Sequence, residues 1–266
     1  MRENILIVGC GNMGGAMLAG WLAGGIAPER FTVVDPVLAE VPAGVTLRRD
    51  LPDHHEGLVL LGVKPQLLGD VAPQLAALVG PQCVLLSMLA GVELSSLAER
   101  FPQAGGVVRV MPNLAVALGK SPVALAGRVD SATQDAITVL MQPLGVPLWL
   151  VDDAEFDLIT ALVGSGPAFV YRFIDALTAG AAALGLDPGQ AERFAVSMVE
   201  GAAGLAASSD ASPAELARRV SSPGGTTERG VALLDADGAL ASLVEATLRA
   251  ARDRGRELAE AARKAI

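Results

Sequence analysis

Short runs of apolar residues alternate with longer helical stretches through the first half of the chain. These runs are apolar at nearly every position, which is typical of strands covered by helices on both faces. They occupy residues 5–8, 31–34, 58–61, 83–87 and 107–110, and a further pair at 121–126 and 147–151 flanks a predicted helix at 131–141. The alternation predicts a parallel β-sheet with crossover helices.

The pattern changes after Val151. From Asp152 onward β-branched runs disappear, and alanine-rich helical sequence continues to the end of the chain. Helices are predicted at residues 153–184, with a break at the sequence GSGPA, and at 189–207, 212–220, 226–235 and 240–264. We therefore predict an α/β fold in which a parallel-sheet domain, residues 1–151, is followed by an all-α domain, residues 152–266.

The chain is 52% hydrophobic, so a membrane protein has to be considered. Its best candidate span, residues 158–186, is interrupted by Arg172 and Asp175, and two glycines and a proline break its first part. A membrane-spanning helix needs about 20 apolar residues. The stretch instead predicts a buried helix at a domain or subunit interface, and its surplus apolar surface favours a homo-oligomer.

Charge and cysteine content exclude other classes. With 20 basic and 29 acidic residues the formal charge is −9, which argues against nucleic-acid binding. Cys10 and Cys83 are too few for a disulfide framework, and the start of the sequence lacks the features of a signal peptide. We expect a cytoplasmic protein that binds neither a membrane nor a metal.

The first predicted strand leads into the sequence GCGNMG. Gly9, Gly11 and Gly14 have the spacing G-x-G-x-x-G between a strand and a helix. In a dinucleotide site these glycines permit the tight turn, the approach of the pyrophosphate and the packing of helix on strand. A purely structural turn is the alternative, but the place of the motif at the first strand favours a dinucleotide site. The turn is completed by Cys10, Asn12 and Met13.

Asp35 ends the second predicted strand, where an acid commonly accepts the hydroxyls of the adenosine ribose. A carboxylate there would repel the additional phosphate of NADP, so the sequence favours NADH over NADPH. The alternative interpretation is that Asp35 only starts a turn before Pro36.

Few side chains in this sequence exchange protons near neutral pH. Apart from carboxylates they are His54, His55, Lys64, Lys120, Lys264 and Tyr171. A hydroxy-acid dehydrogenase needs a base to take the alcohol proton as hydride leaves. Reduction of a protonated imine needs no such base, because the iminium carbon is already electrophilic and positioning can carry most of the catalysis. The composition therefore favours imine reduction over carbonyl chemistry.

Two segments of the second half combine glycine with proline. In SSPGGTT, backbone N–H groups at the start of a helix can face a carboxylate, and the hydroxyls of Thr226 and Thr227 can bond an imine nitrogen or the acid. An ordinary glycine turn with a threonine cap fits this segment equally well. GSGPA, at residues 164–168, indicates a close backbone approach or a simple kink.

Taken together, these segments resemble pyrroline-5-carboxylate reductases, in the same order and over nearly the whole chain. The matching motifs are GCGNMG, GVKP at 62–65, MPN at 111–113, GSGPA and SSPGGTT. The resemblance implies a Rossmann domain, a helical domain that interlocks with a partner subunit, dimers that often assemble into decamers, and reduction of 1-pyrroline-5-carboxylate to proline by NADH or NADPH.

The resemblance also implies roles for individual residues. Val63, Lys64 and Pro65 would line the nicotinamide side, with Ala90 and Gly91 nearby and Asn113 in the cofactor site. Thr227 would lie closest to the imine nitrogen and act as the catalytic residue. The other substrate-binding residues would be Asp153, Thr160, Ser222, Pro223, Gly224, Gly225 and Thr226.

Some positions depart from the family pattern. MPN is followed by Leu114 and Ala115 where the family usually has Thr-Pro, and Asp50 stands where members often carry Asn. NADP users often have Ser, Asn or Arg around the position of Asp35. Both acids add negative charge near the expected adenosine, so the family preference for NADPH need not apply to this chain.

Two other functions stay open at this point. A two-domain hydroxy-acid dehydrogenase would carry a Lys and Asn pair in its helical domain, but no lysine lies between Lys120 and Lys264. A non-catalytic dinucleotide sensor or assembly protein would use the SSPGGTT loop only structurally. Binding of NADH without imine-dependent oxidation would support this second alternative.

Overall fold

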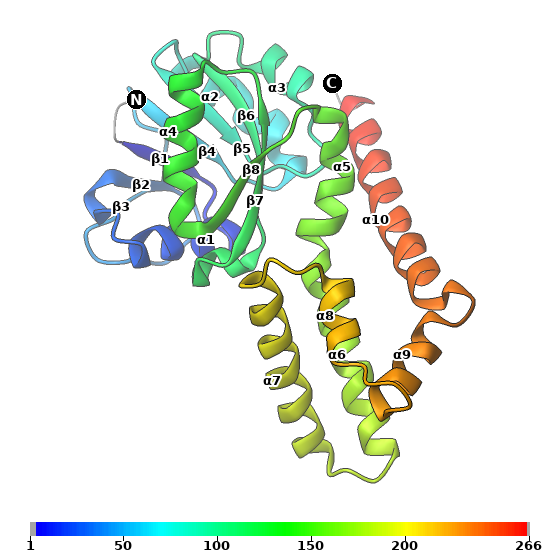
Figure 1. Ribbon diagram of the computed structural model, residues 1–266. Helices are drawn as coiled ribbons and strands as arrows, with labels where there is room; N and C mark the ends of the chain where they lie inside the picture. The colour runs from blue at the N-terminus through cyan, green and yellow to red at the C-terminus, as the bar shows by residue number, and fades with distance from the viewer. Residues whose placement is uncertain (1–3, 265–266) are drawn as a thin grey trace. The chain divides into compact units, whose positions relative to one another are not determined.

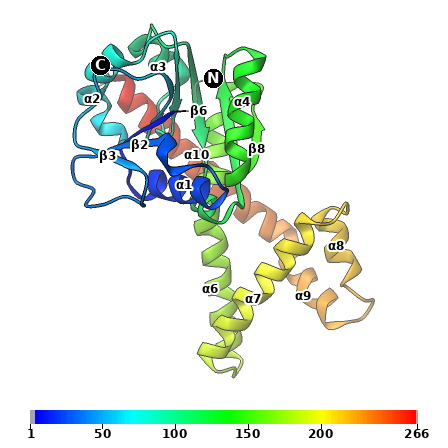
Figure 2. The same ribbon diagram turned by 90° about the vertical axis from the view of Figure 1, so that its left-hand side faces the viewer.

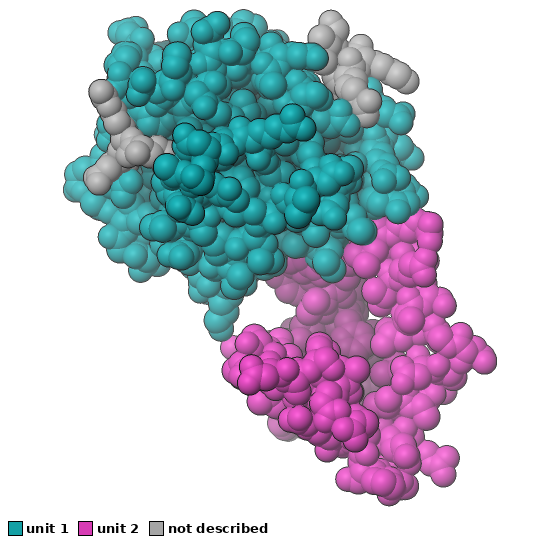
Figure 3. All heavy atoms as spheres, turned by 45° about the horizontal axis from the view of Figure 1, so that its top comes forward, with its two compact units in different colours: residues 1–164, 250–266 teal, residues 165–249 magenta. Residues whose placement is uncertain are grey.

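The computed structural model describes residues 4–264, which divide into two compact units (Figure 3). The first unit contains the chain up to Gly164 together with the residues from Ala250 onward, and the second contains Ser165–Arg249. The sheet and the C-terminal part of the last helix therefore belong to one unit, and most of the helical half belongs to the other.

A sheet of eight strands, among the described residues, forms the centre of the first unit (Figure 1). Its order is β3-β2-β1-β4-β5-β6-β7-β8, and neighbours pair in parallel except β6 and β7, which are antiparallel. The order of β1 to β6 is that of doubly wound dinucleotide-binding folds, which confirms the predicted Rossmann-type domain. The strands are β1 Ile5–Val8, β2 Phe31–Val34, β3 Thr46–Arg48, β4 Gly57–Leu61, β5 Cys83–Ser87, β6 Gly106–Met111, β7 Ser121–Gly127 and β8 Gly145–Trp149.

Helices cover both faces of this sheet (Figures 1 and 2). Ile5 and Ile7 of β1 belong to one buried cluster with α1 (Asn12–Ala23) and α4 (Ser131–Met141). Leu6 and Val8 belong to the other cluster, with α2 (Leu68–Leu78) and α3 (Leu94–Arg100). Because successive side chains of a strand point to opposite faces, both sets have to be apolar, as the sequence pattern predicts.

A short segment follows the last strand and packs with the sheet unit. It consists of a 3₁₀ turn η5 (Asp153–Glu155), a helical turn α5 (Phe156–Ile159) and a π-helical turn η6 (Thr160–Gly164). The other 3₁₀ turns of the described chain are η1 Pro28–Arg30, η2 Pro65–Leu67, η3 Leu114–Leu118, η4 Gln142–Leu144 and η7 Ala236–Gly238. The predicted boundary near Val151 thus marks the end of the strands, whereas the compact units divide after Gly164.

The second unit is entirely helical among the described residues. The helices α6 and α7 lie side by side as a hairpin (Figures 1 and 2). Asp187 and Ser212 cap α7 and α8 by accepting hydrogen bonds from backbone N–H groups, and a proline follows each cap. The helices are α6 Gly166–Ala183, α7 Pro188–Ala207, α8 Pro213–Arg219, α9 Thr226–Asp235 and the first part of α10 Ala239–Lys264.

This second unit buries little of its apolar surface. No residue of α6 is buried, and in α7 only Ala191 and Ala195 are. Large apolar side chains are exposed instead, among them Tyr171 at 65% and Phe194 at 66%. None of the helices within residues 4–264 combines the length and the apolar composition that crossing a membrane requires.

Candidate active site

The turn after β1 is shaped by glycines. Gly9 has a φ of +84°, and a β-carbon there would lie 2.8 Å from the backbone nitrogen of Val63. A β-carbon at Gly14 would lie 3.0 Å from the carbonyl oxygen of Gly9. Neither position has room for a side chain, as a dinucleotide motif requires of its first and third glycines.

The start of α1 leaves its backbone N–H groups open. Gly11 is the N-cap residue of α1, no side chain caps the helix, and no acid stands in its first turn. Gly11 is exposed, and a β-carbon there would meet no atom within 4 Å. Open N–H groups and the helix dipole favour an anion at this point. The pyrophosphate of a dinucleotide fits this position, which also includes Asn12 and Met13.

The Asp35 carboxylate joins the glycine turn to the loop after β2. Its Oδ2 accepts the N–H of Cys10, and its Oδ1 accepts the N–H groups of Val37 and Leu38, each at 3.0 Å. Burial raises the pKa of this carboxyl, but the three N–H donors and the Arg49 cation hold the pKa below its ordinary value. Asp35 is therefore ionised at neutral pH beside the expected ribose position.

At Cys10 the net shift of the pKa is upward, in contrast to Asp35. Desolvation and the charge of Asp35 raise the pKa of the buried Cys10 thiol to about 11. The thiol stays protonated, so Cys10 acts as a small apolar side chain inside the turn.

The loops after β4 and β5 lie beside the glycine turn, at the edge of the sheet formed by the carboxyl ends of its parallel strands. This follows because β1, β4 and β5 are parallel neighbours. A β-carbon at Gly62 would lie 2.6 Å from the carbonyl oxygen of Gly9 and 2.6 Å from Cε of Met88. Glycine at this position lets the loops approach each other. The same edge carries the predicted nicotinamide-side residues Val63, Lys64, Pro65 and Ala90.

Gly91 has a different environment from Ala90. It is buried with a φ of +73°, and a β-carbon there would lie 3.1 Å from the backbone nitrogen of Ala259 in α10. Ala90 is exposed. Of the two predicted neighbours of the nicotinamide, only Ala90 is accessible to a ligand.

Asn113 follows β6 and is engaged on both ends of its carboxamide. Its Oδ1 accepts the N–H of Ala115 at 2.9 Å, and its Nδ2 donates to the carbonyl oxygen of Val163 at 3.2 Å. Its backbone N–H donates to Ser121 Oγ at 3.0 Å. Asn113 is 8% exposed, so little of the side chain is left for a cofactor.

The predicted substrate residues of the first unit are also engaged. Asp153 accepts from Arg109 Nη1 at 2.8 Å through Oδ1 and from the Leu94 N–H at 3.4 Å through Oδ2. The Thr160 hydroxyl donates to the carbonyl oxygen of Phe156 at 2.8 Å, one turn earlier in the helix. Thr160 begins the π-helical turn, a feature that is frequent at functional sites.

The SSPGGTT loop belongs to the second unit and is exposed around its glycines. Gly224 has a φ of +73°, and its N–H donates to Glu228 Oε2 at 2.7 Å. Gly225 is the N-cap residue of α9, without a side-chain cap. The hydroxyl of Thr227 makes no hydrogen bond with any described residue, so it is free to meet a ligand. Ser222, Pro223 and Thr226 are exposed beside it.

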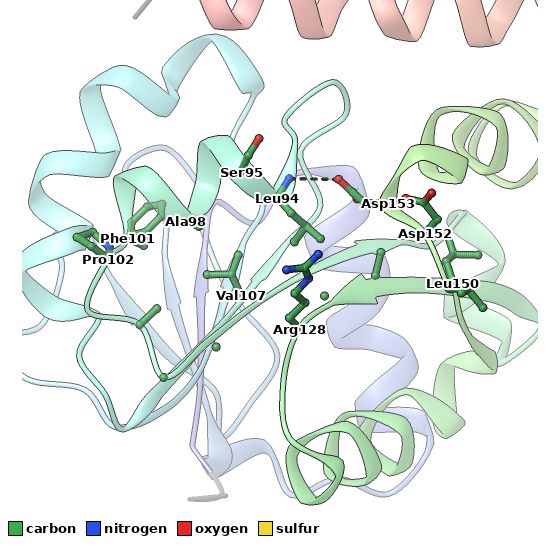
Figure 4. A pocket seen from close by; sticks show the side chains of 16 residues that line it. Leu94, Ser95, Ala98, Phe101, Pro102, Val107, Arg128, Leu150, Asp152 and Asp153 are labelled. Atoms are coloured by element: carbon green, nitrogen blue, oxygen red, sulfur yellow. Dashed lines mark hydrogen bonds between the residues drawn. The ribbon is translucent and has the colours of Figure 1, made fainter.

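A pocket of about 620 Å³ opens elsewhere in the first unit, beside α3 (Figure 4). Val107 at the start of β6, Arg128 after the end of β7 and Asp153 line it. Because β7 is antiparallel to β6, these positions mark the edge of the sheet opposite the glycine turn. The pocket is therefore separate from the dinucleotide turn.

Known proteins match this chain along nearly its whole length. Residues 153–258 match the family model for pyrroline-5-carboxylate reductase dimerisation. The chain is 35% identical to the pyrroline-5-carboxylate reductase of Pseudomonas aeruginosa, over 96% of this chain and 97% of that relative. The chain belongs to the pyrroline-5-carboxylate reductase family. The resemblance carried by the sequence motifs is thereby confirmed.

Solved structures of the family have the same fold. The pyrroline-5-carboxylate reductase of Coxiella burnetii has a TM-score of 0.88 at 29% identity, over 97% of this chain and 99% of that one. The enzyme of Plasmodium falciparum, solved with NADP bound, has a TM-score of 0.79 at 22% identity, over 97% of this chain and 98% of that one. At the latter identity the likeness shows the fold alone.

Sequence reasoning missed three charged residues of this chain. Arg49 donates from Nη1 to the carbonyl oxygens of Asp35 and Leu38, at 2.8 and 2.6 Å. The buried Arg109 forms an ion pair with the half-buried Asp153, and Glu228 accepts the N–H of Gly224. A charged residue inside the apolar run GVVRVM was the available signal for Arg109, because a buried charge needs a partner. Arg49 and Glu228 stand in polar sequence without a comparable signal.

Proposed function

We propose that this protein reduces the C=N bond of 1-pyrroline-5-carboxylate to give L-proline, with a reduced nicotinamide dinucleotide as the hydride donor. The observation that carries the proposal is the glycine turn with the open start of α1, in a chain that aligns with pyrroline-5-carboxylate reductases over nearly its full length. The free Thr227 hydroxyl and the exposed SSPGGTT loop supply polar groups for a small acid.

The residues present fit a dinucleotide, and each has a definite task. The first turn of α1 would bind the pyrophosphate, Asp35 would lie at the ribose, and Val63 and Lys64 would lie on the nicotinamide side. When bound, the nicotinamide supplies a hydride to the ring carbon of the C=N bond. The electron pair of that bond moves onto nitrogen, so the iminium becomes an amine without an oxyanion to protonate.

The substrate side of the proposal rests on the second unit. Backbone N–H groups at the start of α9 would hold the carboxylate, and the Thr227 hydroxyl oxygen would accept the N–H of the iminium. Glu228 already accepts the N–H of Gly224, and the carbonyl oxygen of Ser222 accepts the N–H of Gly225, so the first turn of α9 holds the remaining donors. Positioning of the iminium by these groups, more than proton transfer, would lower the barrier.

We further propose that NADH is preferred over NADPH. Asp35 is ionised, and its three hydrogen bonds leave acceptor capacity on Oδ2 for a ribose hydroxyl. A 2′-phosphate at the same place would put like charges close together. The Arg49 cation, held by two carbonyl oxygens, reduces this repulsion without removing it.

We also propose that the protein works as a homodimer with interlocked helical domains, the unit from which decamers assemble. The dimerisation family model covers residues 153–258, and the second unit exposes large apolar side chains in one copy of the chain. A second copy of the same chain is the partner that these faces would meet.

Steady-state assays test the function directly. The purified protein is mixed with 1-pyrroline-5-carboxylate and either NADH or NADPH, and the absorbance of the reduced nicotinamide is followed. We expect consumption of the reduced cofactor that depends on the imino acid and yields proline. Tight binding of NADH without imine-dependent oxidation would overturn the proposal in favour of a non-catalytic dinucleotide-binding protein.

A further inference from the structure

Strand β6 and the loop after it hold both ends of the segment 153–164. At one end, Arg109 forms an ion pair with Asp153 at 2.8 Å, and its guanidinium carbon lies 3.7 Å from the centre of the Phe156 ring. At the other end, Asn113 Nδ2 donates to the carbonyl oxygen of Val163. Two side chains four positions apart thus fix a segment that ends in the π-helical turn.

The carboxamide of Asn113 is committed to this arrangement. Its oxygen accepts from the Ala115 N–H, which shapes the 3₁₀ turn η3, and its nitrogen reaches the π-helical turn. A carboxamide carries a donor and an acceptor on one planar group, so it makes both bonds at once. Ser121, which is fully buried, fixes the backbone of Asn113 from a third direction.

The π-helical turn itself packs tightly against the end of β6. A β-carbon at Gly164 would lie 3.3 Å from Sδ of Met111, which is closer than ordinary packing allows. Met111 and Asn113 therefore both pack against the π-helical turn. Thr160, the first residue of that turn, takes its position from this packing.

We infer that Asn113 is a positioning residue for the imino acid side of the reaction, and that it acts by holding the π-helical turn through the Val163 carbonyl. This role differs from the cofactor contact that the family resemblance implied. This inference rests on the proposed function at one point, namely that Thr160 faces the substrate. Without the Nδ2 donor, the buried carbonyl of Val163 loses its partner and the turn gains freedom.

The deciding variant is Asn113→Asp. It keeps an acceptor for the Ala115 N–H but replaces the donor to Val163 by a second oxygen, which opposes the carbonyl. Gln142→Glu makes the same amide-to-carboxylate change at an exposed position and is the matched control. Gly164→Ala disturbs the turn at its contact with Met111 and leaves the Asn113 side chain unchanged, and it provides a second route if Asn113→Asp folds poorly.

Three readouts separate positioning from cofactor binding. For Asn113→Asp we expect KM for 1-pyrroline-5-carboxylate to rise roughly tenfold, the size expected for one lost hydrogen bond to a buried carbonyl. The Kd for NADH, measured by titration, should stay within about twofold. Amide hydrogen exchange of residues 160–168 should become faster, while the Gln142→Glu variant matches the parent in all three measurements.

The opposite split would overturn the inference. If NADH binding weakens while KM for the imino acid and exchange of the turn are unchanged, Asn113 binds the cofactor directly. If the variant binds NADH and the imino acid equally more weakly, the whole loop has lost its structure, and this outcome would also count against the inference. If the parent protein does not turn over the imino acid at all, the proposed function fails, and exchange and NADH titration still decide the role of Asn113.

Discussion

Asp35 is the residue on which the proposed cofactor preference depends. Replacing Asp35 with Ser removes the charge that would face a 2′-phosphate, so the ratio of kcat/KM for NADH to that for NADPH should fall. The control Asp53→Ser removes an exposed acid from the loop between β3 and β4 and should leave the ratio unchanged. Steady-state kinetics with both cofactors measure the ratio. Higher efficiency of the native protein with NADPH would show that the argument from Asp35 is wrong.

The same carboxylate predicts how stability depends on pH. Because the pKa of Asp35 is lower in the folded protein than its ordinary 3.8, the ionised acid stabilises the fold above that pH. The contribution is lost as the pH falls through the folded pKa. The difference in unfolding free energy between the parent and Asp35→Asn should therefore stay constant from neutral pH to about pH 5, and shrink below about pH 4. Denaturant titrations across this range would contradict the assignment if the difference did not change.

Thr227 carries the substrate side of the proposal at the residue scale. Thr227→Ala removes one hydrogen bond to a charged nitrogen, worth about 1.5–3 kcal/mol, so kcat/KM should fall roughly tenfold to a hundredfold. The NADH affinity should hardly change. Thr247→Ala removes another helical threonine hydroxyl, one that bonds Leu243 within α10, and serves as the control. An equal loss of NADH affinity in Thr227→Ala would place this hydroxyl at the cofactor.

Sequence patterns locate such residues better than they assign their partners. The position of Asp35 follows from strand and motif spacing, but nothing in the sequence shows that three backbone N–H groups occupy its oxygens. Asn113 is found through the MPN motif, yet its bond to Val163 spans 50 positions along the chain. Contacts of this kind depend on how distant segments pack, which no local pattern encodes.

At the scale of elements, the strands are predictable because both of their faces are buried. Most runs that are apolar at nearly every position match strands of the structure within a residue, whereas β8 begins two residues before the predicted 147–151. The strand β3, Thr46–Arg48, has no such run because it is short and at least partly exposed at the sheet edge. The antiparallel direction of β7 was not predicted, because an apolar run looks the same in either direction.

The meeting of two loops at Gly62 gives a prediction about elements. In Gly62→Ala the new methyl group would lie 2.6 Å from the Gly9 carbonyl oxygen, so the turns after β1 and β4 must move apart. We expect a loss of about 1–3 kcal/mol in stability and weaker NADH binding. Gly69→Ala, in α2 with open space around it, is the matched control and should be neutral or stabilising. Unchanged melting and NADH affinity in Gly62→Ala would contradict the close approach.

At the scale of the molecule, the sequence pattern predicts where the strands end and the helices begin, but it does not predict where the two compact units divide. The composition changes near Val151, yet the contacts of Arg109 and Asn113 keep the segment 153–164 with the sheet. Residues from Ala250 onward also belong to the first unit, although α10 is continuous in sequence. Helical periodicity does not show where along a helix its packing partner changes.

The second unit buries few of its residues within one chain. Its α6 buries no residue, and exposed apolar side chains follow each other on α7, where Phe194 is 66% exposed and Met198 51%. These two residues are four positions apart and so share one face of the helix. Covering such faces with a second copy would provide the apolar burial that a stable interface needs, on the order of 1,000 Å² or more.

The dimer prediction can be tested at this face of α7. Replacing Phe194 and Met198 together with Glu places two charges where the partner would pack, so the variant should sediment as a monomer, with reduced helicity and activity. Val139→Glu introduces a charge at an exposed apolar residue of α4 in the first unit, 62% exposed, and should leave the parent assembly intact. Analytical ultracentrifugation at micromolar concentration, with circular dichroism and the imine assay on the same samples, makes the comparison. A stable and active monomer of the unmodified protein under these conditions would refute the dimer. An intact oligomer of the double variant would show that the interface does not involve this face of α7.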